Sequence, residues 1–237
     1  ADIAANHDGD LNRAKELIWL AKESGADCAK FQHFEADKII NSFEFNKIGK
    51  LRSHQSTWNK SVFEIYDQYH FKRNWTFQVY EECMKAGIDF STTPYDAEAL
   101  NLVKKIVSFI KIGSGDITWT EHIENCAKIG LPILLATGAS SLKDVDRAVK
   151  IIKKFKNQLC IMQCNTNYTI DEDKVNYINL KVLKIFQKRY NKVILGLSDH
   201  TLTDTSVLGS LCFGAKIIEK HFTDDNLRTG PDHKFAI

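Results

Sequence analysis

Val193-Ile194-Leu195-Gly196-Leu197-Ser198-Asp199-His200 is followed, after a helical segment, by Ala215-Lys216-Ile217-Ile218-Glu219-Lys220-His221. Each stretch is a short apolar run that ends on a histidine, and the segment from Asp204 to Cys212 between them has a helical pattern. A strand–helix–strand unit of this kind predicts two neighbouring parallel strands. Parallel strands end at the same edge of a sheet, so we expect His200 and His221 to emerge together and to bind one metal ion.

Short apolar runs alternate with amphipathic segments along the whole chain, which is typical of parallel α/β proteins. Eight runs end near Ala5, Gln32, Thr92, Ile112, Ala136, Gln163, Ser198 and His221. Helices are predicted over Leu11–Ser24, Thr76–Ala86, Ala97–Lys105, Thr120–Lys128, Leu142–Lys154, Ile178–Arg189 and Asp204–Cys212. Eight strand–helix units in 237 residues favour a (β/α)8 TIM barrel over an open sheet. We therefore expect residues 1–237 to be a single barrel domain, truncated at both ends, with one long aromatic loop between Gln32 and Thr92 that acts as a lid or an oligomer contact.

The composition excludes several classes of protein. A net charge of +2 gives no case for a nucleic-acid partner, and no apolar run approaches the length of a membrane span. The six cysteines show no CxxC spacing, which favours reduced thiols in a cytoplasmic protein. These features, and the absence of a signal peptide, predict a soluble cytoplasmic enzyme.

Polar side chains gather at the predicted strand ends, where barrel enzymes carry their chemistry. In chain order they are Asp2, Lys30, Gln32, Thr93, Lys111, Ser114, Asp116, Thr166, Tyr168, Ser198, His200, Glu219 and His221. Lysines, hydroxyls and glycine-rich turns together suit a phosphate group, although a single strand-end lysine is more often a structural ion pair. Asp2 and Asp116 are candidates for proton transfer or for holding sugar hydroxyls, the alternative being solvated loop carboxylates.

Several motifs together resemble the sialic acid synthase family. They are Asn6-His7-Asp8-Gly9, Ala29-Lys30-Phe31-Gln32, Ser91-Thr92-Thr93-Pro94, Lys111-Ile112-Gly113-Ser114-Gly115-Asp116, Thr137-Gly138, Gly196-Leu197-Ser198-Asp199-His200-Thr201, Ile218-Glu219-Lys220-His221-Phe222-Thr223 and Gly230-Pro231-Asp232-His233-Lys234. The resemblance covers nearly the whole chain, with the motifs in the right order.

The resemblance implies a metal-dependent condensation of phosphoenolpyruvate with an N-acetylated amino sugar, which yields a nine-carbon 2-keto acid and phosphate. It implies that His200 and His221 bind a divalent metal, for which we favour Mn²⁺ over Mg²⁺. It assigns the phosphoenolpyruvate contacts to Lys30, Thr93, Lys111, Ser114 and Ser198, and the sugar contacts to Gln32, Asp116, Tyr168 and Asp232. Asp2, Asp116 and His221 are the expected catalytic residues, and Thr166 is an expected substrate contact.

Three positions depart from the family pattern. Asp2 replaces a glutamate, Ala136 replaces a serine that would donate to phosphate, and Thr166 replaces an asparagine. The family also carries a C-terminal antifreeze-like domain, which we expect this chain to lack, and the resemblance implies a homodimer for the full-length protein. Two alternatives remain open: a non-catalytic sugar-binding or metabolite-binding relative, and another phosphoenolpyruvate-dependent aldol-type synthase.

Overall fold

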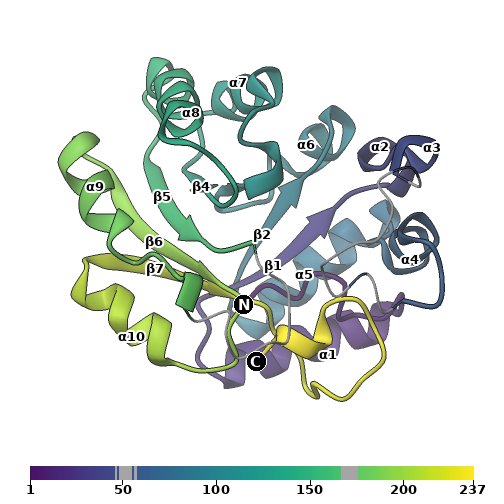
Figure 1. The fold of residues 1–237 in the computed structure, drawn as a ribbon. Helices are drawn as coiled ribbons and strands as arrows, with labels where there is room; N and C mark the ends of the chain where they lie inside the picture. The colour runs from purple at the N-terminus through teal and green to yellow at the C-terminus, as the bar shows by residue number, and fades with distance from the viewer. Residues whose placement is uncertain (46, 48–54, 56–57, 167–175) are drawn as a thin grey trace. The chain divides into compact units, whose positions relative to one another are not determined.

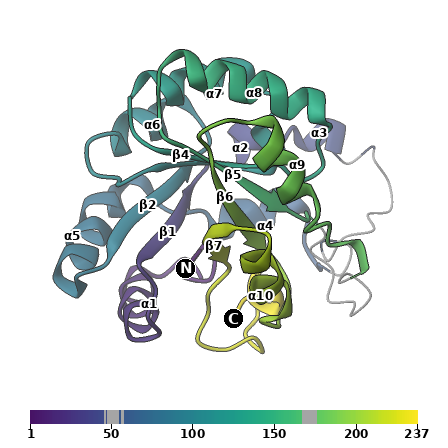
Figure 2. The same cartoon turned by 90° about the vertical axis from the view of Figure 1, so that its left-hand side faces the viewer.

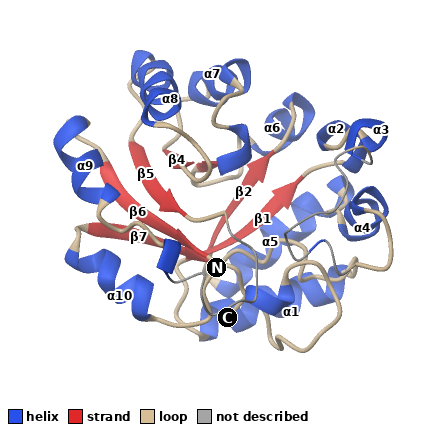
Figure 3. Cartoon of the chain, in the orientation of Figure 1, coloured by secondary structure: helices blue, strands red, loops and turns tan. Residues whose placement is uncertain are grey.

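The computed structural model describes residues 1–45, 47, 55, 58–166 and 176–237. These residues form two compact units. The first unit comprises residues 1–107 and 221–237, and the second comprises residues 108–166 and 176–220. Strands and helices alternate along the chain in both units, as Figure 1 and Figure 3 show. This is the alternation that the apolar runs predict.

The first unit contains one pair of parallel strands. Its elements are α1 (Leu11–Glu23), β1 (Cys28–His33), α2 (Ala36–Ile39), α3 (Ser42–Phe45), α4 (Val62–Tyr69), η2 (Arg73–Trp75), α5 (Thr76–Ala86), β2 (Asp89–Pro94), α6 (Ala97–Val103) and η5 (His233–Phe235). Strands β1 and β2 pair in register from Cys28 opposite Asp89 to His33 opposite Pro94. Helices α1 and α5 pack on each other, α1 also on β1 and α5 on β2. Phe31 on β1 is fully buried and its ring lies against Phe71 and Phe90.

The expected first strand is reduced to a single residue. Asp2 forms isolated parallel bridges to Lys30 and to His221. The chain then turns at once, with φ values of 45° at Ala4 and 53° at Asp8. A left-handed conformation at two non-glycine residues interrupts any ladder, so the expected run up to Ala5 forms no extended strand.

The segment between β1 and β2 is largely helical where the structure describes it, contrary to the long loop expected from the sequence. It holds α2, α3 and α4, which were not predicted, and then α5, which matches the helix predicted over Thr76–Ala86. Helix α4 starts with a capping box, in which Ser61 and Glu64 each accept a hydrogen bond from the other's backbone N–H. The error arose because short helices and aromatic residues in this segment give no long periodic pattern. Its lid or oligomer role is untested.

The second unit contains five parallel strands in chain order, from β3 to β7. Its elements are β3 (Ile110–Ile112), η3 (Ser114–Asp116), α7 (Thr120–Lys128), β4 (Ile133–Ala136), α8 (Leu142–Lys154), β5 (Leu159–Cys164), α9 (Val182–Arg189), β6 (Ile194–Asp199), α10 (Thr205–Cys212) and β7 (Ala215–Lys220). Helices α7 and α8 pack on each other, and both are drawn along the top of Figure 2. Ser141 caps α8 and exchanges hydrogen bonds with Asp144.

Gly196 lets β6 pass close to its neighbours. A Cβ atom there would lie 2.9 Å from both Cys160 Sγ and the backbone oxygen of Ile217, and 3.0 Å from Met162 Cγ. Cys160 and Met162 are buried, and Ile217 packs against them. The β6–β7 register also shifts between Leu195 and Gly196. Glycine is therefore required where the ladder bends over this core.

Two negative findings apply to the part of the chain that the structure describes. The six cysteines are all free thiols. Among the described residues, no helix combines the length and the apolar character that crossing a bilayer would require.

Candidate active site

The carboxylate of Asp2 is the centre of a buried polar cluster in the first unit. Lys30 Nζ lies 2.7 Å from Asp2 Oδ2, and Gln32 Nε2 donates to the same oxygen at 3.2 Å. His221 Nε2 lies 3.7 Å from it. Lys30 and Gln32 reach the same point because residues two apart on β1 face the same side. The cluster brings together four of the residues that the resemblance assigned to substrates, metal and catalysis.

Thr93 on β2 extends this cluster. Lys30 Nζ donates to Thr93 Oγ1 at 3.4 Å, and the Lys30 side chain is only 5% exposed. A buried ammonium group beside a carboxylate and a hydroxyl is held in one position, unlike the flexible side chain of a solvent-exposed lysine. It forms a fixed cation to which an anionic substrate can bind.

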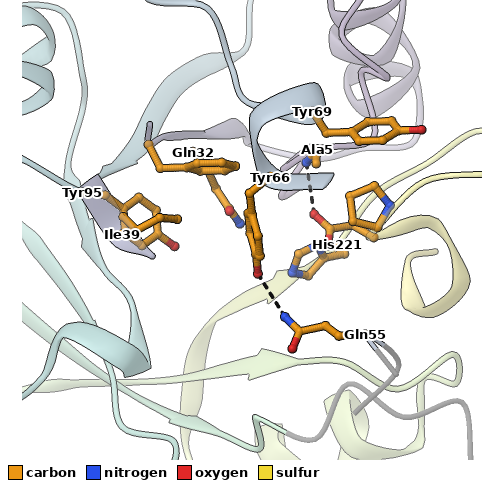
Figure 4. A pocket seen from close by; sticks show the side chains of 11 residues that line it. Ala5, Gln32, Ile39, Gln55, Tyr66, Tyr69, Tyr95 and His221 are labelled. Atoms are coloured by element: carbon orange, nitrogen blue, oxygen red, sulfur yellow. Dashed lines mark hydrogen bonds between the residues drawn. The ribbon is translucent and has the colours of Figure 1, made fainter. Parts of the chain in front are cut away.

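A cavity of about 330 Å³ adjoins Gln32 and His221 in the first unit (Figure 4). Its lining residues are Ala5, Gln32, Phe34, Ile39, Gln55, Tyr66, Tyr69, Tyr95, His221, Pro231 and Asp232. One part is aromatic and aliphatic, and the other carries an amide, an imidazole and a carboxylate. A mostly apolar wall with a few polar groups is the usual construction of a small-molecule site.

Tyr66 forms much of the aromatic part. Its ring packs edge-on against Phe34, with centroids 5.4 Å apart, and its hydroxyl accepts a hydrogen bond from Gln55 Nε2 at 3.4 Å. Burial, and then the Asp232 carboxylate, raise the pKa of Tyr66 to about 12. The phenol therefore stays protonated and can donate to a ligand.

Hydrogen bonds to Asp232 and to its neighbour His233 hold Asp232 at the cavity. The backbone N–H of Ala5 donates to Asp232 Oδ2 at 3.1 Å. The neighbouring His233 is fully buried, with Nδ1 2.7 Å from Thr223 Oγ1 and Nε2 2.8 Å from Asp8 Oδ1. Both ring nitrogens are thus engaged, which fixes the turn that presents Asp232.

The second unit has its own buried lysine–carboxylate pair. Lys111 on β3 and Glu219 on β7 form a short ion pair, and Ser198 Oγ on β6 donates to Glu219 Oε1 at 2.8 Å. Ser198 and Glu219 are register partners. Glu219 was in the strand-end inventory, but no role was predicted for it, because its pairing with Lys111 depends on the strand order rather than on local sequence.

Ser114 and Thr166 approach each other around Gly138. Ser114 Oγ accepts from the Gly138 backbone N–H at 3.0 Å. A Cβ at Gly138 would lie 2.6 Å from Thr166 Cγ2 and 2.9 Å from Ser114 Oγ. A side chain at this position would therefore displace both residues. The close approach explains the glycine of the Thr137-Gly138 motif.

Asp116 lies in the same unit but has a different environment. Its Oδ2 atom is buried and has no hydrogen-bond partner among the described residues, and burial raises the pKa of the carboxyl group to about 6. A carboxyl group that titrates near neutrality suits proton transfer. Its burial and its raised pKa support a catalytic candidate.

His200 is oriented as a metal ligand would be. Its Nδ1 lies 3.0 Å from the backbone oxygen of Asn165. A carbonyl can only accept, so Nδ1 carries a proton. In the neutral imidazole this tautomer places the lone pair on Nε2, the atom that would bind a metal. In the first unit, His221 supplies an imidazole next to the Asp2 carboxylate. These donor types fit a divalent cation, although within neither unit do the described residues form a group of three His, Cys, Asp or Glu that could hold one.

One predicted residue, Tyr168, lies outside the described residues. The sequence reasoning missed Phe34, Tyr66 and Tyr95 as cavity walls. The concentration of aromatic residues before β2 hinted at Phe34 and Tyr66, whereas Tyr95 follows β2 and had no such signal.

Comparison with known proteins places these features in a family. The NeuB family model matches residues 17–237. The chain is 31% identical to human N-acetylneuraminate-9-phosphate synthase over 240 residues, covering 100% of this chain and 65% of that protein. It is 33% identical to N,N'-diacetyllegionaminic acid synthase of Legionella pneumophila, covering 98% and 65%. The chain thus spans about 65% of the length of these curated relatives.

Solved structures agree. The N-acetylneuraminic acid synthetase of Leptospira borgpetersenii, crystallised with citrate, matches with a TM-score of 0.85 and 29% identity, over 100% of this chain and 76% of that one. A truncated 3-deoxy-D-arabino-heptulosonate 7-phosphate synthase of Thermotoga maritima matches at 0.72 with 12% identity, a likeness of fold alone. These matches confirm the α/β class and the parallel strand–helix alternation predicted for a (β/α)8 barrel. With a family model that covers nearly all of its length, the chain belongs to the NeuB family.

Proposed function

We propose that the protein condenses phosphoenolpyruvate with an N-acetylated amino sugar to form a nine-carbon, sialic-acid-like 2-keto acid, with release of phosphate. Family membership supports the reaction class. The observation that carries the proposal is the Asp2 cluster, in which Lys30, Gln32 and His221 surround one buried carboxylate beside a sugar-sized cavity.

Two buried lysines are the anion-binding groups of this proposal. Lys30 with Thr93, and Lys111 with Ser198 and Ser114, bind the phosphate and carboxylate of phosphoenolpyruvate. Both ammonium groups are neutralised by carboxylates before substrate arrives, which limits the cost of burying them. The hydroxyls add directional donors.

The acceptor sugar occupies the cavity. Gln32 and Asp232 hold its hydroxyl groups, Tyr168 and Thr166 contribute as the family pattern implies, and the aromatic wall receives the acetamido group. C3 of phosphoenolpyruvate attacks the aldehyde carbon, a C–C bond forms, and the aldehyde oxygen takes a proton. Water then adds to the cationic C2 and loses a proton, and the C2–O bond breaks to release phosphate.

Asp2 and Asp116 are the proton-handling residues. The Asp2 carboxylate accepts hydrogen bonds from Lys30 and Gln32, which hold it ready to position water or to accept its proton. Asp116, with its raised pKa, can carry a proton at neutral pH. The glutamate-to-aspartate change at position 2 shortens the reach of the carboxylate by about one methylene.

His200 and His221 are the residues that would hold a divalent cation, which when bound polarises the aldehyde oxygen. Mn²⁺ is favoured over Mg²⁺ because both ligands are imidazoles. A homodimer and a cytoplasmic location belong to the same proposal. The free cysteines support a reducing compartment.

The test is phosphate release from phosphoenolpyruvate by the full-length protein, with Mn²⁺ and a panel of N-acetylated hexoses. Release with one sugar, abolished by EDTA, would support the synthase and identify the acceptor. Measurable phosphoenolpyruvate binding without release on any sugar would instead support a non-catalytic relative.

The variant Asp2→Asn sharpens this test. It keeps the size of the side chain but removes the charge beside Lys30, so turnover should fall about 100-fold or more. Because it neutralises one partner of a buried ion pair, urea unfolding of the variant is measured beside turnover. Turnover equal to that of the unmodified protein would remove Asp2 from the proposed chemistry.

A further inference from the structure

Strands β6 and β7 carry a second ion pair, which the reaction proposed above does not use. Asp199 and Lys220 are register partners, and Lys220 Nζ lies 2.7 Å from Asp199 Oδ2. Their side chains are 3% and 10% exposed. A charge pair this well covered costs desolvation energy, so it is retained only where its hydrogen bonds are nearly complete.

The hydrogen bonds of Lys220 are complete. Its ammonium group has three N–H donors. They reach Asp199 Oδ2, the backbone oxygen of Thr201 at 2.6 Å and the backbone oxygen of Thr203 at 3.2 Å. Two of the three bonds therefore hold the backbone of the loop that follows β6.

Asp199 closes the other side of the same loop. Its Oδ1 accepts from the Thr201 backbone N–H at 3.2 Å. Its Oδ2 accepts from Thr201 Oγ1 at 2.9 Å and from Ser206 Oγ at 2.7 Å. Ser206 belongs to α10, so the carboxylate joins the strand end, the loop and the next helix.

His200 lies inside this bonded loop, between Asp199 and Thr201. The hydrogen bond from its Nδ1 to Asn165 fixes the direction of the ring. The bonds from Lys220 and Asp199 fix the backbone on which the ring is mounted. Since side chains alternate along a strand, a pair that faces away from His200 can hold its backbone without touching its ligand atom.

We infer that Asp199 and Lys220 are positioning residues, which hold the backbone of residues 200–203 so that His200 Nε2 is preorganised to bind a divalent cation. The inference rests on the proposed metal role of His200. Groups that orient metal ligands typically contribute about 10-fold to 100-fold in metal affinity when they are removed.

The experiment measures the Kd of Mn²⁺ alone for the full-length protein, by electron paramagnetic resonance of the free ion, together with thermal unfolding. Lys220→Met should weaken Mn²⁺ binding about 10-fold to 100-fold. Arg189→Met is the matched control, because it removes a partly exposed ion pair with Asp146 in the same unit, and it should leave the Kd unchanged.

Two further variants separate positioning from folding. Asp199→Asn combined with Lys220→Met removes both charges, so it should recover most of the thermal stability that Lys220→Met loses but none of the lost affinity. If Lys220→Met does not fold, the Kd of Mn²⁺ is measured for Ser206→Ala instead. This variant removes one hydrogen-bond donor to Asp199 and leaves both charges. It should weaken Mn²⁺ binding a few-fold.

The outcomes are distinct. A folded Lys220→Met protein that binds Mn²⁺ with the unmodified Kd overturns the positioning inference and leaves the proposed function standing. An unmodified protein that does not bind Mn²⁺, or a His200→Ala protein that binds it equally well, overturns the metal role itself and the inference with it.

Discussion

The two faces of the β6–β7 strand pair carry different ion pairs. Neighbouring residues of each strand point to opposite faces. On one face Ser198 donates to Glu219, which pairs with Lys111 of β3. On the other, Asp199 pairs with Lys220 directly across the ladder. Lys111 makes one hydrogen bond among the described residues, so two of its three N–H donors remain for a ligand. All three donors of Lys220 are used within the protein.

The difference shows how to tell a binding lysine from a structural one at a strand end. Both ammonium groups are buried beside carboxylates, so burial and charge do not separate them. The two lysines are distinguished by how many of their N–H donors already form hydrogen bonds within the protein. By this criterion the Lys111 face can bind an anion, and the Lys220 face supports the loop that carries His200.

The largest expected effect comes from removing the cation of the first face. Lys111→Met removes the cation of a largely covered ion pair and keeps the Glu219 carboxylate, so the free energy of unfolding should fall by about 3 kcal/mol. Since Lys111 is also proposed to bind phosphoenolpyruvate, kcat/KM should fall about 100-fold to 1,000-fold. Urea unfolding and steady-state phosphate release measure the two effects.

The double variant Lys111→Met with Glu219→Gln provides the control. It also removes the charge of Glu219 and should recover most of the stability while activity stays low. Recovery of activity as well would show that Lys111 serves only to neutralise Glu219, and the contrast between the faces would be lost.

A smaller effect is expected from a substitution of Gly196, the glycine within β6. In Gly196→Ala the new methyl group meets the backbone oxygen of Ile217 at 2.9 Å, and a backbone atom cannot move aside. The free energy of unfolding should fall by about 2 kcal/mol. Gly115→Ala is the matched control for stability, since a Cβ there meets no atom within 4 Å. Equal stabilities of the two variants would contradict the close approach.

The sequence predicted the strand ends of this pair well, because β6 and β7 are apolar runs that stop at polar motifs. It also predicted that Lys30, Gln32 and Thr93 would meet, since they lie at neighbouring strand ends. It did not predict the partners of Lys111 and Lys220. Those depend on strand register and on which side chains share a face, and a register is set by packing rather than by local pattern.

The start of the chain and the segment before β2 were harder to predict for different reasons. The run before Ala5 reads as a strand, but left-handed residues end it after Asp2. The aromatic segment reads as a loop, yet it forms α4 and places Tyr66 in the cavity wall. In both places tertiary contacts override a weak local signal.

Asp116 contrasts with both lysine–carboxylate pairs, because its carboxyl group forms no ion pair with a cation among the residues that the structure describes. Its pKa of about 6 in the native state exceeds the ordinary value of 3.8. Between about pH 4 and 6 the native state keeps a proton that the unfolded chain has lost, so stability falls as the pH rises through this range. Asp116→Asn should be more stable than the unmodified protein by about 1–2 kcal/mol at pH 7.5, and the difference should shrink at pH 4. Urea unfolding at both pH values checks this, and a constant difference would refute the raised pKa.

The smallest expected effects come from a matched pair of hydroxyls. Ser198 donates to Glu219 at 2.8 Å and Ser206 donates to Asp199 at 2.7 Å. Each serine-to-alanine change should cost about 1 kcal/mol of stability. Only Ser198→Ala should raise the KM for phosphoenolpyruvate, by a few-fold. An equal rise of KM in both variants would mean that substrate binding is not confined to the face that carries Ser198.

The central claim is that phosphoenolpyruvate loses phosphate by C–O cleavage after its C3 joins a sugar aldehyde. The direct test supplies the full-length protein with Mn²⁺, the acceptor sugar and phosphoenolpyruvate that carries ¹⁸O in its bridging oxygen. Mass spectrometry then follows phosphate and product. We expect ¹⁸O-labelled phosphate formed in equal amount with a nine-carbon 2-keto acid. Unlabelled phosphate, or phosphate released without that product, would contradict the proposed reaction.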